Sequence, residues 1–351
     1  MQHSHTPEEK LPIHISPGQR AWMRFKMNRR GYYSLWLFSI VFILSLFAEF
    51  ISNDKPLIVN YQETYYFPVF KFYKETEFGG DFETEADYQD EYVRNILTSN
   101  GNWMLEPLNN FSYTTINYDS ALPNPAPPSE FNAIGTDDRG RDVLARLIYG
   151  FRLSILFAIA LTIIGTGIGI LAGMIQGYFG GRTDLFFQRF IEIWGAMPEL
   201  YLLIIFASIF QPNVWLLIIL LSMFGWMGLS DYVRAEFLKG RNMDYVKSAK
   251  ALGLSNRGIM FRHLLPNSLT PVITFMPFRV SAAILALTSL DYLGLGVPPD
   301  TPSLGELLAQ GKENISAWWL SFTTFGVLVG ALMMLIFIGE AVREALDTRR
   351  S

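Results

Sequence analysis

Long apolar runs without charge alternate with shorter polar stretches along most of the chain. The clearest runs are Leu153 to Ile175 and Ala317 to Gly339, neither of which holds a charged residue. Each is longer than the roughly 18 apolar residues that mark a candidate membrane-spanning helix. The apolar runs predict six spans, at residues 33–51, 153–175, 188–210, 213–231, 269–294 and 317–340. The pattern therefore predicts an all-α integral membrane protein with six transmembrane helices.

Basic residues predict which ends of these helices face the cytoplasm. Five of them precede the first run: Arg20, Arg24, Lys26, Arg29 and Arg30. Under the positive-inside rule they place the N-terminal tail, residues 1–32, in the cytoplasm. An even number of spans returns the C-terminal tail, residues 346–351 with Arg349 and Arg350, to the same side. The loop from Asp231 to Ser268 also falls there and carries seven Lys and Arg against three Asp and Glu.

The segment between the first two spans, residues 52–131, is polar and strongly acidic. The whole chain has a net charge of −4, but residues 54–131 alone hold 13 Asp and Glu against 4 Lys and Arg. The same orientation puts this insertion on the outer side of the membrane. Its 16 aromatic residues indicate a small folded unit, because a purely solvating segment has few aromatics. Beyond a proline-rich linker, residues 142–152 predict an amphipathic helix that lies at the outer interface.

Composition excludes several classes of chemistry. The chain is 50% hydrophobic and 17% charged, against about 25% charged in soluble domains. It has no Cys, which excludes disulfides, thiolate metal sites and cysteine nucleophiles. Three of its four His lie in the N-terminal tail, so we expect no metal site. The phosphate-binding loop Gly-x-x-x-x-Gly-Lys-Ser/Thr and common catalytic motifs do not occur in the sequence, which disfavours an enzyme.

Four glycines recur at a spacing of four residues in the second predicted span: Gly165, Gly169, Gly173 and Gly177. On a helix this spacing makes a smooth ridge along which a second helix can approach closely. We interpret the ridge as a helix-packing surface, with a direct role in a translocation pathway as the alternative.

Charged residues inside the predicted spans are candidates for a translocation pathway. Glu192 and Glu199 are seven residues apart, which places both on one face of a helix. Arg279 lies in the fifth span, and an intramembrane charge costs at least about 2.5 kcal/mol unless it is paired or faces a cavity. We therefore expect Arg279 to pair with Glu199 or, as second choice, with Glu192. The alternative is that each charge snorkels or faces a neighbouring subunit. Asp291, near the outer end, is expected to be hydrated.

The basic loop between the fourth and fifth spans predicts a helix, a break and a second helix. Asp244 suits a helix N-cap and Gly253 suits the position after a helix C-cap. Ser255 or Asn256 can cap a second short helix, which Pro266 separates from the fifth span. Two short helices at the membrane surface would present a rigid knob to a partner, and a solvated basic loop is the alternative.

This segment resembles the EAA loop of ATP-binding-cassette (ABC) importer permeases. That pattern reads Glu-Ala-Ala, three residues, Gly, nine residues, Ile, one residue, Leu-Pro, and Ala249, Gly253, Leu265 and Pro266 match it. Lys247, Ser248 and His263 stand where the family usually has Glu, Ala and Ile. The resemblance implies that ATPase subunits bind within the loop 232–268, at Asp244, Lys247, Ser248, Ala249, Leu252, Gly253, Leu254, His263, Leu265 and Pro266.

Other motifs narrow the resemblance. Residues 135–152 (GTDDRGRDVLARLIYGFR), 177–181 (GYFGG), 293–299 and 302–305 are similar to the C-type permease of dipeptide and oligopeptide importers. The likeness covers about residues 131–348. The long acidic insertion makes the chain most similar to the YejE-type branch, which is associated with uptake of peptides and microcin C.

The resemblance implies one permease subunit of a bacterial inner-membrane peptide importer, with a permease core over residues 132–345. Its implied partners are a second permease subunit in a heterodimer, a cytoplasmic ATPase pair or fused ATPase, a periplasmic peptide-binding protein and membrane lipid. ATP and Mg²⁺ would bind the ATPases, so no cofactor and no nucleic acid are expected here. Without the resemblance, Glu192, Glu199 and Asp291 leave open an ion-coupled secondary transporter.

Overall fold

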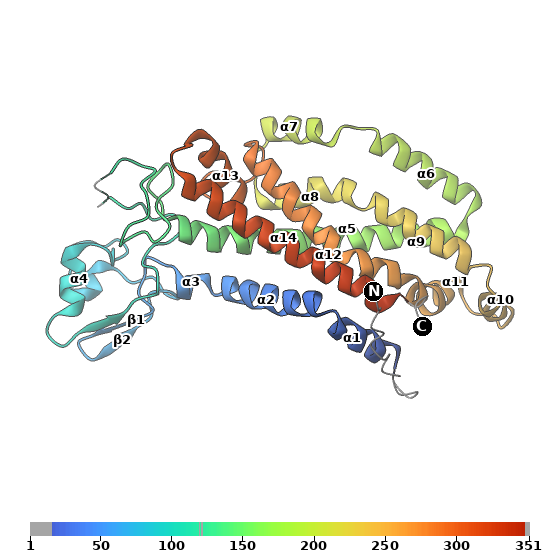
Figure 1. Ribbon diagram of the computed structural model, residues 1–351, viewed down its shortest axis with the longest axis horizontal. Helices are drawn as coiled ribbons and strands as arrows, with labels where there is room; N and C mark the ends of the chain where they lie inside the picture. The colour runs from blue at the N-terminus through green and yellow to red at the C-terminus, as the bar shows by residue number, and fades with distance from the viewer. Residues whose placement is uncertain (1–15, 119, 121, 348–351) are drawn as a thin grey trace, which may run out of the picture.

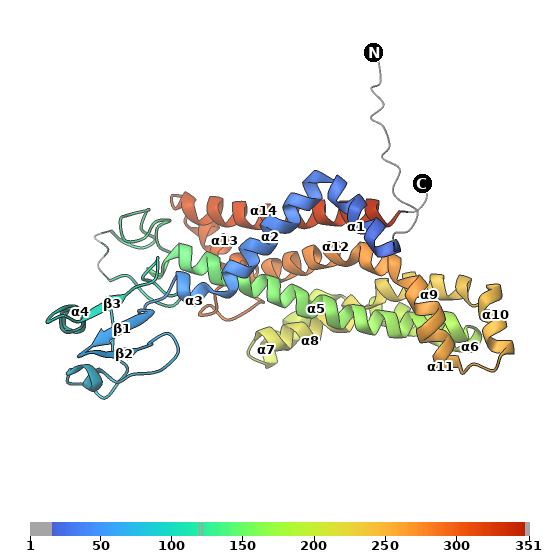
Figure 2. The same cartoon turned by 90° about the horizontal axis from the view of Figure 1, so that it is seen from below.

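The computed structural model describes residues 16–118, 120 and 122–347. Predictions that concern the first 15 residues, and those for Arg349 and Arg350, lie outside the described residues. The described chain is elongated: long helices run side by side, a small lobe caps one end, and a helical hairpin lies at the other end (Figure 1). Figure 2 shows the N-terminal helices crossing one face of this bundle.

The N-terminal part forms helices α1 (Pro17–Met27), α2 (Arg29–Leu46) and α3 (Ala48–Ile51). A capping box starts α1, in which Ser16 and Gln19 bond to each other's backbone N–H groups and Pro17 occupies the first turn. Phe25 of α1 packs on Ala341 and Ala345 near the end of α14 (Trp318–Leu346). This contact holds α1 against the last turns of α14.

Residues 52–131 include a small folded lobe with a core of its own. Strands β1 (Ile58–Tyr61), β2 (Thr64–Tyr66) and β3 (Trp103–Leu105) form an antiparallel sheet in the order β2-β1-β3. The 3₁₀ helix η1 (Glu75–Phe78) and helix α4 (Glu91–Thr98) complete it. The lobe core combines aromatic and aliphatic side chains, and Phe78 within it is 1% exposed. The prediction of a wholly α-helical protein is therefore wrong for this lobe, and the chain is mostly helical.

Four helices within the described residues are long and apolar enough to cross a membrane. They are α5 (Val143–Phe179), α8 with α9 (Val214–Gly225 and Met227–Gly240), the helix from Asn256 to Tyr292, and α14. A bent pair, α6 (Gly181–Gly195) and α7 (Glu199–Ile209), would add a fifth. The structure thus contains four or five candidate spans, against the six predicted.

Two predicted helices differ in shape from those in the structure. The third apolar run is not one straight helix, because α6 and α7 meet at an angle of 66° across Ala196 to Pro198. Pro198 has no backbone N–H to donate, so the α6 ladder cannot continue through it. The amphipathic helix expected at 142–152 is not a separate surface element either. Asp142 caps α5 by accepting from the N–H of Ala145 (2.8 Å), and the helix then continues unbroken to Phe179.

Pro266 does not separate the second short helix from the fifth span. The chain runs from α11 (Asn256–Gly258) through a π-helical stretch, η2 (Ile259–Leu264), directly into α12 (Leu265–Tyr292). A proline inside a helix lacks one donor and clashes with the carbonyl four residues earlier. The π turn just before Pro266 shifts the hydrogen-bond spacing and lets the helix accommodate it.

A short helix that the sequence analysis did not predict, α13 (Leu304–Glu313), lies between α12 and α14. Ser303 caps it by accepting from the N–H groups of Gly305 and Glu306 (3.1 and 3.3 Å). Leu304 and Leu307 enter the main apolar core together with residues of α5 and α14. This helix brings Glu306 into the interior at the lobe end of the bundle.

The glycine ridge of α5 lies against the α8–α9 segment. A Cβ atom added at Gly173 would come within 2.4 Å of the carbonyl oxygen of Ser230, and one at Gly177 within 2.5 Å of the Cβ of Phe237. Gly169 faces the carbonyl of Trp226 at 2.9 Å in the same way. The backbone of α5 therefore lies directly against backbone and side-chain atoms of α9. At these glycines the α5 face has no room for side chains.

Alanine at Gly173 should therefore destabilise the protein. Overpacking of a tight contact costs about 1–3 kcal/mol, so Gly173→Ala should lower the thermal unfolding midpoint of the purified protein in mild detergent. Gly167→Ala is the matched control, because no atom lies within 4 Å of the added Cβ. Alanine is favoured over glycine in helices by about 1 kcal/mol, so the control should not lower the midpoint. Equal midpoints for the two variants would contradict this packing.

Candidate functional site

The hairpin at the end of the bundle opposite the lobe consists of α10 (Asp244–Ala251), α11 and η2. Met243, and not Asp244, is the N-cap residue of α10, so the predicted capping role of Asp244 is wrong. Asp244 lies in the first turn, where its charge favours the helix dipole, and it pairs with Lys247 at 3.2 Å. Both side chains of this pair are exposed, so it contributes little to stability.

Gly253 ends α10 in a Schellman motif. Its φ angle is +79°, and its N–H donates to the carbonyl of Lys250 (3.0 Å). The N–H of Leu254 donates to the carbonyl of Ala249 (3.1 Å). Ser255 then caps the next helix by accepting from the N–H of Gly258. The turn therefore has a defined shape that depends on the left-handed conformation of Gly253.

The hairpin is anchored to the bundle by a buried cluster. Val246 of α10 and Ile259 of η2 are fully buried and pack with Val233 and Phe237 of α9 and with residues of α5. Tyr178 of α5 donates from its hydroxyl to Asn256 Oδ1 (2.7 Å). The hairpin thus forms one packed unit with the ends of α5 and α9.

The ten residues proposed for ATPase coupling differ in exposure. Ala249 is buried, and His263 and Leu265 are half-buried. The other seven are exposed: Asp244, Lys247, Ser248, Leu252, Gly253 and Leu254 lie on the hairpin, and Pro266 lies in the first turn of α12. Leu252 is 81% exposed, and Phe261, which the sequence analysis did not single out, is also exposed nearby in η2. The hairpin tip therefore presents apolar side chains on a rigid frame, which is typical of a protein interface.

The charged residues predicted for a pathway are not brought together. No ion pair joins Arg279 to either glutamate in the described part of the chain; its Nη2 instead donates to the carbonyl of Gly225 (2.9 Å). Glu192 pairs with Arg189 at 2.5 Å on exposed α6. Glu199 begins α7 beyond the bend, where it lines a largely apolar pocket of about 150 Å³. The bend is the physical reason that the two glutamates do not share one helical face.

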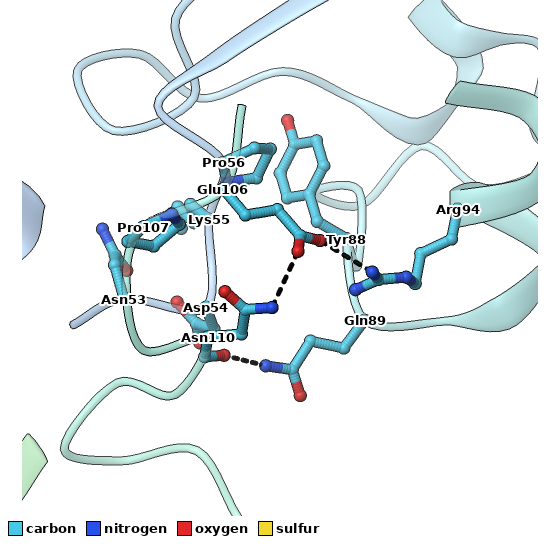
Figure 3. Close-up of a pocket in the computed structure, with 10 residues that line it drawn as sticks. All are labelled: Asn53, Asp54, Lys55, Pro56, Tyr88, Gln89, Arg94, Glu106, Pro107 and Asn110. Atoms are coloured by element: carbon cyan, nitrogen blue, oxygen red, sulfur yellow. Dashed lines mark hydrogen bonds and ion pairs between the residues drawn. The ribbon is translucent and has the colours of Figure 1, made fainter. Parts of the chain in front are cut away.

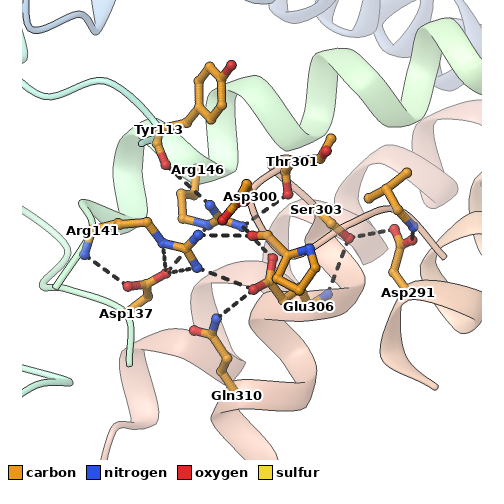
Figure 4. Close-up of polar contacts among 12 residues, drawn as sticks. Tyr113, Asp137, Arg141, Arg146, Asp291, Asp300, Thr301, Ser303, Glu306 and Gln310 are labelled. Atoms are coloured by element: carbon orange, nitrogen blue, oxygen red, sulfur yellow. Dashed lines mark hydrogen bonds and ion pairs between the residues drawn. The ribbon is translucent and has the colours of Figure 1, made fainter. Parts of the chain in front are cut away.

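The hydration predicted for Asp291 is wrong. Its side chain is 7% exposed and accepts from Ser303 Oγ (2.5 Å) and from the N–H of Val297 (2.9 Å). These bonds tie the end of α12 to the start of α13 (Figure 4).

A buried polar centre lies at the lobe end of the bundle (Figure 4). Asp137 and Arg146 are fully buried, and Arg141 is 3% exposed. Arg141 donates from Nε to Asp137 Oδ2 (2.7 Å), and its Nη2 lies 3.3 Å from Glu306 Oε1. Arg146 pairs with Glu306 and with Asp137 (Nε to Oδ2, 3.6 Å). Two arginines and two carboxylates therefore balance each other's charge inside the protein.

Backbone carbonyls complete this polar centre. Arg141 donates to the carbonyl of Pro299 (2.9 Å), and Arg146 donates to those of Tyr113 and Thr301 (3.2 Å each). Burial raises the pKa of Glu306, and the two arginines oppose that effect. The centre joins the loop before α5, the α12–α13 connection and the segment below the lobe into one unit.

The sequence analysis quoted the residues of this centre without giving them a role. Asp137, Arg141 and Arg146 fall in the motif over residues 135–152, but their partner Glu306 is 160 residues beyond Arg146. One local signal was available: Ser303 and Glu306 have the Ser-x-x-Glu spacing of a capping box, which indicates the start of α13.

A small polar pocket of about 10 Å³ lies between residues 53–56, which lead into the lobe, and residues 106–110, which lead out of it (Figure 3). Glu106 accepts from Asn110 Nδ2 (2.8 Å) and pairs with Arg94 (2.7 Å), while Gln89 donates to the carbonyl of Asn110. A volume of this size admits at most one water molecule. The pocket is a hydrogen-bonded contact between these segments and is too small to be a substrate site. Within the described residues, no group of three or more His, Asp or Glu could hold a metal ion.

Comparison with known proteins identifies the family. The family model described as the binding-protein-dependent transport system inner membrane component matches residues 165–351. The inner membrane ABC transporter permease YejE of Escherichia coli strain K12 is 51% identical over 96% of this chain and 99% of its own. This chain belongs to the binding-protein-dependent ABC permease family. It is a multi-pass inner-membrane transport component and not an enzyme, as the sequence resemblance predicted.

Other relatives place the permease in the OppC and DppC branch. Residues 16–68 match the N-terminal transmembrane domain of oligopeptide transport permease C. The peptidoglycan transport system permease YejE of Agrobacterium fabrum is 48% identical over 97% of this chain and 96% of its own. The oligopeptide permease OppC of Haemophilus influenzae is 35% identical over 68% and 78%. A solved chain of the inward-facing MetNI methionine ABC transporter aligns at a TM-score of 0.48 with 15% identity, over 57% of this chain and 96% of that one.

Breaking the buried polar centre should destabilise the permease strongly. Arg146→Met leaves Glu306 buried without its main partner, which costs about 3–5 kcal/mol, and should lower the thermal midpoint in mild detergent. Lys74→Met is the control, because the Lys74–Glu83 pair is exposed (side chains 47% and 81%) and contributes about 0–1 kcal/mol. Glu306→Gln added to Arg146→Met should recover part of the loss. Similar midpoints for Arg146→Met and Lys74→Met would show that the centre contributes little.

Proposed function

We propose that this permease is one of two permease subunits of an ATP-driven peptide importer and forms half of its translocation pathway. The observation that carries the proposal is its 51% identity with a YejE permease over nearly the whole chain, together with oligopeptide permeases among its relatives. The name of the Agrobacterium relative, a peptidoglycan transport system permease, extends the proposed cargo class to peptidoglycan. Uptake of microcin C stays a prediction of the sequence resemblance.

The proposed topology has six spans, with α2 and the bent α6–α7 pair added to the four long helices. The N-terminal helices with their five basic residues and the hairpin of α10 and α11 lie toward the same end of the bundle (Figure 1). The acidic lobe lies at the opposite end. Under the positive-inside rule this arrangement supports cytoplasmic termini and a periplasmic lobe within residues 52–131.

The hairpin supports a role in coupling to ATPases. An ABC permease works with ATPase and binding-protein partners, and the ATP and Mg²⁺ would bind the ATPases. Leu252, Leu254 and Phe261 would insert into a cleft of that partner, an ATPase pair or one fused ATPase chain. Because the hairpin packs on α5 and α9, its displacement would move those helices as a rigid body.

The exposed face of α6 and α7 is the proposed site of the second permease subunit and of the pathway between the two. Glu192 and Glu199 lie on these helices, and Arg279 contacts the nearby Gly225 carbonyl. Glu192 pairs with Arg189 on α6, but Glu199 and Arg279 form no ion pair within the described residues, and an unpaired intramembrane charge faces a partner or an aqueous cavity. Asp291 is left out of the pathway, because it is bonded to the start of α13. Family membership removes the ion-coupled secondary transporter as an alternative.

The lobe is proposed to contact the periplasmic binding protein or to guard the entrance to the pathway. Its own core makes it a rigid projection. Exposed aromatic side chains, such as Tyr65 and Trp103 paired across the sheet, lie among its many carboxylates. Tyrosine and tryptophan are enriched in protein interfaces because each combines a large apolar area with a polar tip.

A charge at the hairpin tip should uncouple the permease from its ATPase. Leu252→Asp should reduce both the amount of co-purifying ATPase and the uptake of a labelled tripeptide by at least about tenfold. The free-energy cost of burying an unpaired charge at an interface exceeds the roughly 1.4 kcal/mol that corresponds to a tenfold change in affinity. Leu252→Met keeps an apolar side chain of similar volume and should retain both. Undiminished ATPase recovery and uptake with Leu252→Asp would argue against the coupling role.

Removal of the lobe tests its proposed contact. The N–H of Leu57 donates to the carbonyl of Leu105 (2.7 Å), so the two ends of residues 58–104 are adjacent and a four-residue Gly-Ser linker can join them. This variant should keep the ATPase bound but lose capture by the binding protein and most uptake. The control is the double variant Glu63→Gln, Glu83→Gln, which changes charge and keeps the lobe. Full uptake and full binding-protein capture without the lobe would overturn the proposal.

A further inference from the structure

Residues 67–72, the phenylalanine loop, lie between β2 and η1 and expose three apolar rings. Phe67, Phe70 and Phe72 are all exposed, and Phe70 reaches 73%. The N–H of Phe70 donates to the carbonyl of Phe67 (3.0 Å), which closes a turn. At the base of the loop the rings of Tyr66 and Tyr73 are in contact, with centroids 5.1 Å apart, and Tyr73 belongs to the lobe core. The lobe therefore holds the three rings outward in a defined turn.

Negative charge is absent from this stretch of an otherwise acidic lobe. Residues 64–74 hold no Asp or Glu and two lysines, whereas residues 75–91 hold eight carboxylates. Lys71 is exposed between Phe70 and Phe72, and its Nζ lies 5.1 Å from the centre of the Tyr73 ring. Phenylalanine combined with lysine is typical of segments that lie at a membrane surface, because the rings enter the hydrocarbon and the amine stays among the headgroups.

The position of α3 gives the level of the loop relative to the membrane. Arg152 of α5 directly precedes the uncharged run Leu153 to Ile175, so it marks the edge of the hydrocarbon layer at the lobe end. Arg152 pairs with Glu49 of α3 (Nη1 to Oε1, 2.8 Å). One turn earlier in α5, the Tyr149 hydroxyl donates to the carbonyl of Ser52, just after α3 (2.9 Å). Helix α3 therefore lies at the level of this edge.

The phenylalanine loop meets α3 at that level. Phe70 makes an edge contact with Phe50 of α3, with 5.6 Å between the ring centroids, and Phe50 contacts Phe47 at 6.1 Å. Phe47 and Phe50 are exposed as well, so the rings of the loop and of α3 form one apolar surface beside the hydrocarbon edge. Figure 1 shows α3 and the sheet along one side of the bundle and α6 and α7 along the other. The proposed interface with a second permease subunit therefore leaves this surface free to meet lipid.

We propose that the phenylalanine loop inserts into the lipid leaflet beside the lobe, with Phe67, Phe70 and Phe72 at the top of the acyl chains and Lys71 among the phosphates. With α3 it would attach the lobe to the membrane at a second point and fix its orientation on the bundle. In the proposed topology this is the outer leaflet. The lipid contact requires neither a peptide cargo nor a bound partner, so its failure and the failure of the proposed function are separate outcomes.

Fluorescence quenching by brominated lipids tests the contact. The chain has no Cys, so Lys71→Cys provides a unique thiol in it for a bimane label, and the wild-type chain measures labelling of other subunits. The assembled transporter is reconstituted in nanodiscs of phosphatidylcholine brominated either near the headgroup or near the chain end. Bromine near the headgroup should lower the emission at least about twofold and bromine near the chain end less, because interfacial segments reach only about 5–10 Å into the bilayer.

A matched label on the same lobe controls for general access to the lipid. Glu91→Cys is exposed in the first turn of α4, which lies away from the bundle (Figure 1). Its label should show no quenching by either lipid.

Polar substitutions show whether the rings hold the loop in the lipid. Phe70→Glu with Phe72→Glu, added to Lys71→Cys, should abolish the quenching, because carboxylates are expelled from hydrocarbon. The control pair, Phe82→Glu with Tyr92→Glu, replaces two exposed aromatic residues elsewhere on the lobe and should retain it. The first measurement keeps all three phenylalanines, so it stands even where the double variant does not fold.

Four outcomes would overturn the proposal. They are an unquenched label at residue 71, equal quenching at residues 71 and 91, quenching that survives the paired substitutions of Phe70 and Phe72, and a label at residue 71 that is shielded only when the periplasmic binding protein is added. The last would assign the loop to a protein interface instead of lipid.

Discussion

The close contact between α5 and α9 is the interaction on which the rest of the structure depends. Inside a membrane the hydrophobic effect does not drive helices together, because lipid tails are as apolar as leucine. Association must come from close packing, and the glycine face of α5 allows the backbone of α9 to approach at Gly169, Gly173 and Gly177. A contact without side chains on one side has a single register. That register determines where α9 ends and where the hairpin begins.

Helix α5 also connects the two ends of the molecule. It has 37 residues, which corresponds to about 55 Å. At one end Arg146 is locked into the polar centre, and at the other end Tyr178 bonds to Asn256 of the hairpin. A rod that is fixed at both ends transmits a displacement instead of absorbing it. The proposed coupling of the hairpin to the pathway relies on this stiffness.

The two polar ends are built by different means. At the lobe end, Asp137, Arg141, Arg146 and Glu306 pair with one another and with backbone carbonyls, and these bonds fix the α12–α13 connection against the start of α5. At the hairpin end, the shape comes from a glycine turn and apolar anchors, and the charged side chains stay exposed. The first is suited to a fixed frame. The second leaves a surface free to meet a partner.

The sequence by itself determined the class of protein and the position of its long helices, because apolar length and capping residues act within a few turns. Each predicted run corresponds to a helix or a helix pair, and Gly253 was located as the end of α10 from its residue type alone. Only the tertiary structure decided that Arg146 meets Glu306, that Asp291 is buried, and that Phe70 of the lobe contacts Phe50 of α3. Those features depend on which distant segments pack together, and burial, charge pairing and ring contacts exist only once they have done so.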